Sequence, residues 1–149
     1  MIQKRLFFVA LMAGVFASGY LSGQSGSLRV AEHVEAASAG RVFEIRTYTT
    51  NEGKLKALHN LFRHHTTKLF KKHGMTNIGY WSPEDAPRSQ NTMIYILAHP
   101  SREAAGKNWE EFRNDPEWLK ARADSEVDGK IVAKVDSVFA TATDFSPLK

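Results

Sequence analysis

The sequence predicts an α+β domain in which an antiparallel sheet carries its helices on one face. Two observations lead to this prediction. Over residues 41–149, β-rich segments and segments of helical periodicity follow one another in the order β-α-β-β-α-β. The composition, with 42% hydrophobic and 24% charged residues among 149, is that of a globular chain with room for one core.

The first strand is expected over residues 42–49, which read VFEIRTYT. The segment is rich in β-branched and aromatic residues, and its side chains alternate between two faces. One face holds Phe43, Ile45 and Thr47, and the other holds Glu44, Arg46 and Tyr48. Since this strand is central in the predicted sheet, both faces should be covered, so the charges on the second face require partners.

A long helix is expected over residues 53–73, ended by Gly74 as a C-terminal cap. At about 100° per residue its apolar positions gather on one broad face. These positions are Leu55, Leu58, Leu61, Phe62, Leu69 and Phe70. His65 falls close to this face and is interpreted as a hydrogen-bonded core residue.

The remaining elements complete the pattern. Strands are expected over residues 76–82 and 92–99, joined by the proline-containing loop PEDAPRSQN. A helix over residues 101–114 is followed by a shorter one to about residue 127, which Asp115 caps and Pro116 starts. A strand over residues 132–144 ends the chain. The order is that of the ferredoxin-like fold.

The third strand predicts a second copy of the chain. Met93, Tyr95 and Leu97 lie on one of its faces, and Ile94, Ile96 and Ala98 lie on the other. Helices on one side of the sheet cover only one of these two apolar faces. Because most soluble oligomers are symmetric, we expect the other face to be covered in a homodimer.

The N-terminal segment predicts export. Lys4 and Arg5 precede an apolar run over residues 6–15 and then small residues, the layout of a signal peptide or signal anchor over residues 1–21. Cleavage after Ala17 is favoured over an uncleaved membrane anchor, because the apolar run is shorter than the roughly 20 residues that span a bilayer. Residues 22–40 are small and polar and read as a flexible linker before the domain at 41–149. An extracytoplasmic, periplasmic location is expected.

Charge and cysteine content exclude several functions. Without the two basic residues of the leader the net charge falls from +4 to +2, which makes nucleic acid an unlikely partner. The chain has no cysteine, so disulfides and thiol chemistry are absent. No nucleophile elbow, phosphate loop, HExxH or paired-carboxylate motif occurs either. Four histidines at 59, 64, 65 and 73 do not converge on one helix face, so we expect no metal and no cofactor.

Three blocks of sequence carry a resemblance to a known family. They are FEIRTYTTNEGKLKALHNLFRHHTTKLFKKHGMTNIGYW, NTMIYILAHPSREAAGKNWEEFRNDPEW and SVFATATDFSPL, which match in order from residue 42 to about 148. The chain resembles the NIPSNAP family of the dimeric α/β-barrel superfamily. The resemblance implies the ferredoxin-like fold and a barrel of two sheets packed face to face, and it implies no particular reaction.

The stretch NWEEFRNDPEW places two of the three tryptophans of the chain in one corner. Trp109 and Phe112 share a helix face, and Pro116 starts a new helix that brings Trp118 back toward them. The favoured interpretation is a corner that seals the core, with Asp115 as a helix cap. The alternative is that Trp109 and Trp118 line a ligand cleft.

Two further groups are candidates for ligand binding. Arg46 either pairs with Glu44 or makes a contact across the dimer, or it meets an anionic ligand that Tyr48 and Tyr80 orient. His59 and Arg63 lie at one edge of the apolar helix face, where a cleft is able to open. The candidate pocket is therefore formed by seven residues, namely Arg46, Tyr48, His59, Arg63, Tyr80, Trp109 and Trp118.

The function that these features favour is a homodimer that binds a small aromatic or anionic ligand or another protein, without catalysis. The alternative is a cofactor-independent enzyme that resembles the monooxygenases of the same superfamily. Such an enzyme would hold an aromatic substrate beside Arg46, Tyr48, His59 and Trp109.

Overall fold

The structure, a computed structural model, describes residues 40–149, which form the predicted α+β, ferredoxin-like fold. The predicted leader and all but the last residue of the linker lie outside the described residues. All neighbouring strands are antiparallel, and the sheet order is β2-β3-β1-β4. The strands are β1 (Val42–Thr50), β2 (Thr76–Trp81), β3 (Thr92–His99) and β4 (Val132–Thr141).

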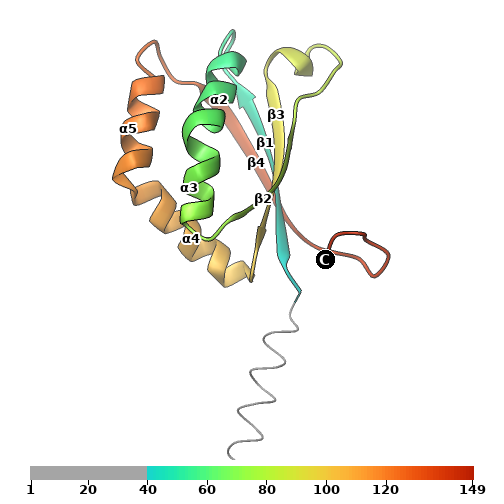
Figure 1. Cartoon of the computed structure of the whole chain (residues 1–149). Coiled ribbons are helices and arrows are strands. Elements are labelled where there is room, and N and C mark those ends of the chain that lie inside the picture. Colours follow the sequence, from blue (N-terminus) through green and yellow to red (C-terminus); the bar gives the residue numbers. More distant parts are fainter. Residues whose placement is uncertain (1–39) are drawn as a thin grey trace, which may run out of the picture. The chain divides into compact units, whose positions relative to one another are not determined.

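The helices all lie on one side of the sheet (Figure 1). They are α2 (Leu55–Leu61), the π-helical turn η1 (Phe62–Thr66), α3 (Thr67–Lys72), α4 (Arg102–Asn114) and α5 (Pro116–Ser125). A short 3-10 turn, η2 (Arg88–Gln90), lies in the connection between β2 and β3. The core lies between the helices and the sheet, where Tyr95 of β3 stacks on Phe70 of α3 and on Tyr80 of β2. No helix in the described part of the chain is long and apolar enough to span a bilayer.

The predicted helix over residues 53–73 is interrupted at η1. There the backbone N–H of Thr67 donates to the carbonyl of Phe62, five residues earlier, and the hydroxyl of Thr66 donates to the carbonyl of Leu61 at 3.3 Å. The wider turn shifts the side chains that follow it, so Thr66 is buried and His65 is exposed. The interpretation of His65 as a core residue was therefore wrong.

The corner between α4 and α5 has the predicted cap. The carboxylate of Asp115 accepts a hydrogen bond from the backbone N–H of Glu117 at 2.8 Å, and Pro116 occupies the first turn. Lys72 and His73 of the α3 end also contact this carboxylate, at 2.7 and 2.6 Å. Hydrogen bonds from Lys72, and then from His73, hold the pKa of Asp115 well below its usual range.

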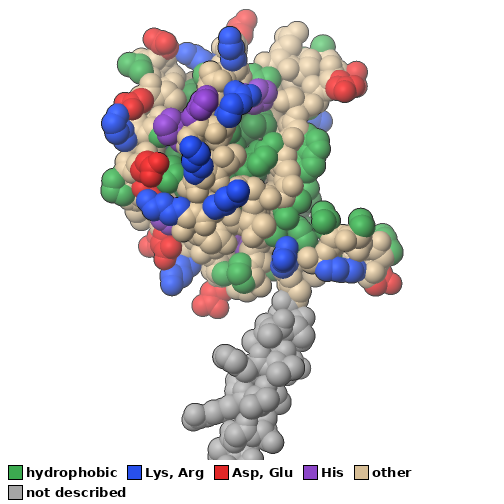
Figure 2. Space-filling view, in the orientation of Figure 1, with side chains coloured by type: hydrophobic (Ala, Val, Ile, Leu, Met, Phe, Trp, Pro, Cys, Tyr) green, Lys and Arg blue, Asp and Glu red, His purple; other side chains and the backbone are tan. Residues whose placement is uncertain are grey.

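The other side of the sheet, here called the open face, is apolar as predicted. Register places three rows of side chains there, formed by Phe43, Ala98 and Ala140, by Ile45, Ile96 and Val138, and by Thr47, Ile94 and Asp136. Ile45 is 37% exposed and Val138 is 61% exposed. Hydrophobic side chains are also visible along the sheet in Figure 2, whereas Lys and Arg are spread over the helices. No helix of the described chain covers this face.

Candidate functional site

The centre of the helix-facing side of the sheet is a buried carboxylate. Glu44 of β1 is 1% exposed. One of its oxygens accepts hydrogen bonds from the Nε1 of Trp109 at 2.6 Å and contacts the Nε2 of His99 at 3.2 Å. The other oxygen accepts from Arg46 at 2.6 Å and from the hydroxyl of Ser137 at 2.7 Å. These five residues, here called the Glu44 network, join β1, β3, β4 and α4.

Arg46 extends the Glu44 network toward a cavity. Its guanidinium lies 4.2 Å from the centre of the Trp109 ring and 3.4 Å from the hydroxyl of Tyr48. Burial opposes the charge on Arg46, but Tyr95, Tyr48 and Glu44 outweigh it and raise the pKa of the guanidinium. The predicted ion pair with Glu44 is thus confirmed, and the pair carries no net charge at neutral pH.

Glu44 remains ionised despite its burial. Burial alone would raise its pKa, but hydrogen bonds from His99, Ser137, Trp109 and Arg46 together lower the pKa from 4.5 to about 2. Because the pKa of Glu44 is lower in the folded state, the unfolded state takes up this proton at a higher pH than the folded state does. The stabilisation is therefore complete above the unfolded value of 4.5 and is lost as the pH falls toward about 2.

Acid unfolding should accordingly depend on Glu44. We expect the wild-type protein to lose about 3 kcal/mol of unfolding free energy through this one group between pH 4.5 and about 2. Glu44→Gln should be less stable at neutral pH and should lose less stability over the same acidic range. Urea unfolding, followed by circular dichroism at a series of pH values, gives the free energy of unfolding of both proteins as a function of pH. If the two proteins lose stability equally between pH 4.5 and about 2, Glu44 is not the group responsible.

A cavity of about 310 Å³, here called the Trp109 cavity, opens beside the Glu44 network between the sheet and the helices. Arg46 and Tyr48 line it from β1, and the other walls come from α2, η1, α3, α4, α5, the loop between α5 and β4, and the start of β4. Its interior is mainly aromatic, formed by Tyr48, Phe62, Phe70, Trp109, Phe112 and Trp118. The volume lies at the lower end of the range for small-molecule sites.

Basic side chains surround the mouth of the Trp109 cavity. Four cations line it against a single lining carboxylate, that of Glu126, and they are Arg113, Arg122, Lys130 and Lys134. Glu126 accepts a hydrogen bond from the Nε of Arg122 at 3.1 Å, so that one of these charges is compensated. The mouth therefore keeps an excess of positive charge.

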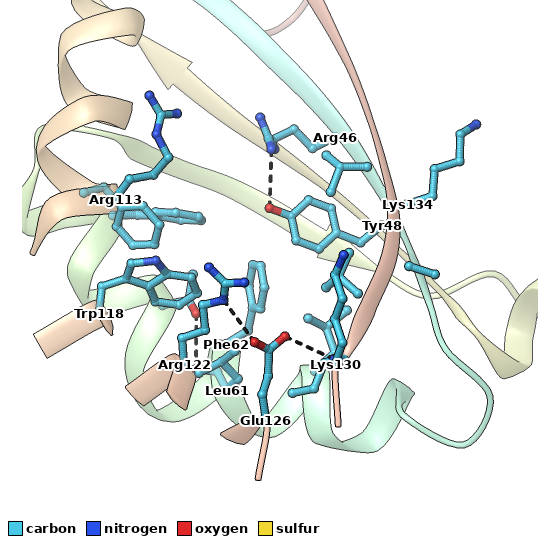
Figure 3. A pocket seen from close by; sticks show the side chains of 18 of the residues that line it. Arg46, Tyr48, Leu61, Phe62, Arg113, Trp118, Arg122, Glu126, Lys130 and Lys134 are labelled. Carbon is cyan, nitrogen blue, oxygen red and sulfur yellow. Dashed lines mark hydrogen bonds and ion pairs between the residues drawn. The ribbon is translucent and has the colours of Figure 1, made fainter. Parts of the chain in front are cut away.

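The four basic side chains differ in direction. Figure 3 shows Arg122 and Lys130 on either side of Glu126, facing the cavity. Lys134 points away from it and forms an ion pair with Asp136 at 2.9 Å. Among residues 40–149, no carboxylate lies within ion-pair distance of Lys130, and only the Nε of Arg122 is hydrogen bonded. Lys130 and the outer nitrogens of Arg122 are thus the groups best placed to meet an anion.

The structure divides the seven predicted site residues between two places. Arg46, Tyr48, Trp109 and Trp118 line the Trp109 cavity. His59, Arg63 and Tyr80 line a second cavity of about 280 Å³ at the β2 edge of the sheet, together with Trp81 and Ser82 among others. We name this second space the Trp81 cavity. Tyr48 and Tyr80 therefore do not orient one ligand in the same cavity.

The Trp81 cavity contains a histidine and a serine in contact. The Nε2 of His59 lies 3.2 Å from the hydroxyl of Ser82. Burial, and then the neighbouring Arg63, lower the pKa of His59, which keeps its ring uncharged at neutral pH. No group of three or more His, Cys, Asp or Glu side chains that could hold a metal occurs within residues 40–149.

The tryptophan corner seals the core as predicted, and the same rings also line a cavity. Trp109 is 8% exposed and packs edge-on against Phe112, whose ring centre lies 4.5 Å from that of Trp118. These rings belong to the core or pack against it, and they also line the cavity. Sequence reasoning missed Arg122 and Lys130, because Arg122 on α5 and Lys130 in the loop between α5 and β4 reach the mouth without any local pattern.

The fold and the cavity define a ferredoxin-like α+β domain with a ligand-sized space between its sheet and helices. The sequence model of the NIPSNAP family matches residues 43–147. Since this match spans more than half of the chain, the chain belongs to the NIPSNAP family. No functionally curated protein matches it significantly.

Solved structures share this fold. A NIPSNAP family protein of unknown function from Agrobacterium tumefaciens aligns with a TM-score of 0.64 at 23% identity, over 75% of this chain and 96% of its own. A NIPSNAP-like domain protein from Burkholderia xenovorans aligns with a TM-score of 0.61 at 15% identity, over 73% of this chain and 91% of its own. At these identities the similarity establishes the fold alone.

Proposed function

We propose that the protein is an exported homodimer that binds a small amphipathic anion, an aromatic or aliphatic carboxylate, in the Trp109 cavity. The observation that carries this proposal is the combination of an aromatic interior with a basic mouth. An apolar body gains free energy from leaving water, at roughly 25 cal/mol for each Å² of buried surface. The cations at the mouth then favour a ligand whose polar end is negative.

The carboxylate of the ligand is placed at the mouth and its apolar body inside. Arg46, at the inner end, is already neutralised by Glu44 at 2.6 Å. A second carboxylate there would be buried next to the first one, where like charges repel and burial penalises both. The side chain of Arg122 is 52% exposed and Lys130 is exposed as well, so they attract the anion without a large cost of desolvation.

Binding of naphthoate and of neutral naphthylmethanol, two compounds of similar shape, tests this arrangement. Isothermal titration calorimetry is expected to show tighter binding of naphthoate, and added salt should reduce the difference. Lys130→Met should weaken naphthoate binding by about two- to fivefold, the range for an exposed charge pair, and should leave naphthylmethanol binding unchanged. Lys134→Met is the matched control, because Lys134 points away from the cavity, and it should behave as wild type.

Two results would count against the proposal. If neither compound binds at millimolar concentration, the cavity is a packing gap of the core. If naphthoate and its alcohol bind equally well and salt has no effect, the basic mouth has no role in recognition.

The homodimer is proposed from the open face. Ile45, Ile96 and Val138 form an apolar row across three strands of a surface that no described helix covers. A symmetric partner would bury this row against its own copy. We expect sedimentation velocity to give twice the protomer mass at micromolar concentration, whereas a stable single protomer would contradict the proposal.

Export is proposed from residues 1–21, where Lys4 and Arg5 precede an apolar segment. We expect mass spectrometry of the protein recovered from its cells to find a mature chain that begins near Ser18. A chain with an intact leader in the soluble cytoplasmic fraction would contradict export, and one in the membrane fraction would indicate an uncleaved anchor.

A further inference from the structure

Phe62 lies between the Trp109 cavity and the Trp81 cavity. Phe62 lines both the Trp109 cavity and the Trp81 cavity, and no other lining residue is shared. Its ring lies edge-on to Tyr48, which lines the first cavity, at 5.9 Å between ring centres, and to Tyr80, which lines the second, at 5.8 Å. Phe62 is therefore the residue that these two cavities share, and its ring packs against an aromatic side chain from each of them.

The ring of Phe62 packs among aromatic neighbours, and its backbone N–H donates to the end of α2. It is 5% exposed, and the rings of Tyr95 and Phe70 lie 5.2 and 6.0 Å from it on the core side. It is the first residue of the π-helical turn η1, a kind of irregularity found frequently at functional sites. The turn thus begins at the side chain that divides the available space.

The two cavities together would hold a longer ligand than either one alone. Their volumes are about 310 and 280 Å³. An extended chain that enters at the basic mouth and passes the position of Phe62 would reach Tyr80 and the His59 and Ser82 pair. With the ring in place, such a chain has to end inside the Trp109 cavity.

We propose that Phe62 is a specificity-determining residue that limits the length of the bound carboxylate to what the Trp109 cavity holds. The inference rests on the ligand class proposed above. In this proposal the Trp81 cavity is an extension of the ligand site, and the Phe62 side chain closes off that extension in the wild type. Removal of the ring should therefore convert a protein for short carboxylates into one that also accepts long ones.

The test is a series of straight-chain carboxylates from hexanoate to hexadecanoate, titrated calorimetrically into wild type and Phe62→Ala. In the wild type, affinity should rise by up to about fourfold for each added methylene and then level off when the Trp109 cavity is full. In Phe62→Ala the rise should continue over further methylenes before it levels off. Phe62→Leu removes less volume, so its affinity should level off at an intermediate chain length. This variant can be used for the test if the alanine variant fails to fold.

The three tryptophans of the chain provide an independent readout of where the ligand lies. Trp109 and Trp118 line the first cavity, and Trp81 lines the second. In Phe62→Ala, long carboxylates should change the Trp81 fluorescence, measured as the difference between proteins with and without Trp81→Phe. In the wild type, the same compounds should leave Trp81 unaffected.

Phe70→Ala is the matched control. Phe70 is also buried and lines the Trp109 cavity, but it does not line the Trp81 cavity. Its removal should enlarge the first cavity without any response from Trp81. One outcome is that wild type binds short carboxylates while Phe62→Ala keeps the same length limit and shows no change in Trp81 fluorescence. That result refutes the role of Phe62 and leaves the proposed function intact. If wild type binds no carboxylate of the series and no naphthoate, the proposed function itself fails.

Discussion

Replacement of Glu44 by alanine is expected to lower the free energy of unfolding by about 3 to 5 kcal/mol, the cost of removing one partner from a buried ion pair. The substitution leaves the partly buried Arg46 without its counter-ion and removes the acceptor of Trp109 and Ser137. The indole N–H of the buried Trp109 then lacks its partner in a region with little access to water. Urea denaturation at neutral pH measures the loss.

Glu110→Ala is the matched control for this substitution. Glu110 lies on the same helix as Trp109 but is exposed, and it has no ion pair within residues 40–149. Its replacement should change stability by no more than about 0.5 kcal/mol. If Glu44→Ala lowers the free energy of unfolding by less than about 1 kcal/mol, water replaces the lost carboxylate, and the Glu44 network contributes little to stability.

Replacement of Ile45 by lysine is expected to separate the proposed dimer into protomers. Ile45 lies in the middle of the open face, between Ile96 of β3 and Val138 of β4. By symmetry, the change would place two like charges in an apolar interface without counter-ions, which costs several kcal/mol. Such a cost corresponds to a weakening of association by a factor on the order of a thousand. Sedimentation velocity over a range of concentrations gives the dissociation constant.

Val127→Lys separates this effect from a general effect of added charge. Val127 is 81% exposed in the segment between α5 and β4, away from the open face, and its replacement should leave the association unchanged. If Ile45→Lys sediments as a dimer as tightly as wild type, the interface lies on another surface.

The regular part of the fold could be predicted from the sequence because periodicity encodes it directly. The alternation of residues 42–49, the helix cap at Asp115 and the two apolar faces of residues 92–99 each follow from local residue patterns, and the structure confirms them. The interruption of the long helix at Phe62 could not be predicted in this way. A π-helical turn depends on which residues the sheet requires to be buried, and a count at 100° per residue does not contain that information.

The candidate site was predicted only in part for a related reason. The pairing of Glu44 with Arg46 could be expected, because charges on a central strand need partners. His99, Trp109 and Ser137 lie 55, 65 and 93 positions from Glu44 in the sequence, so no local pattern predicts their contacts with it. The separation of Tyr48 from Tyr80 likewise depends on the position of Phe62 between them.

The Glu44 network also affects how cooperatively the domain unfolds. Besides Arg46 on β1 itself, its donors come from β3, α4 and β4, and the full set of hydrogen bonds to Glu44 forms only when these elements are docked. Detachment of α4 alone would withdraw Trp109 and open a route for water to an ion pair at the centre of the sheet. Partial opening therefore carries much of the cost of complete unfolding, which ties β1, β3, β4 and α4 into one cooperative unit whose amide protons exchange together.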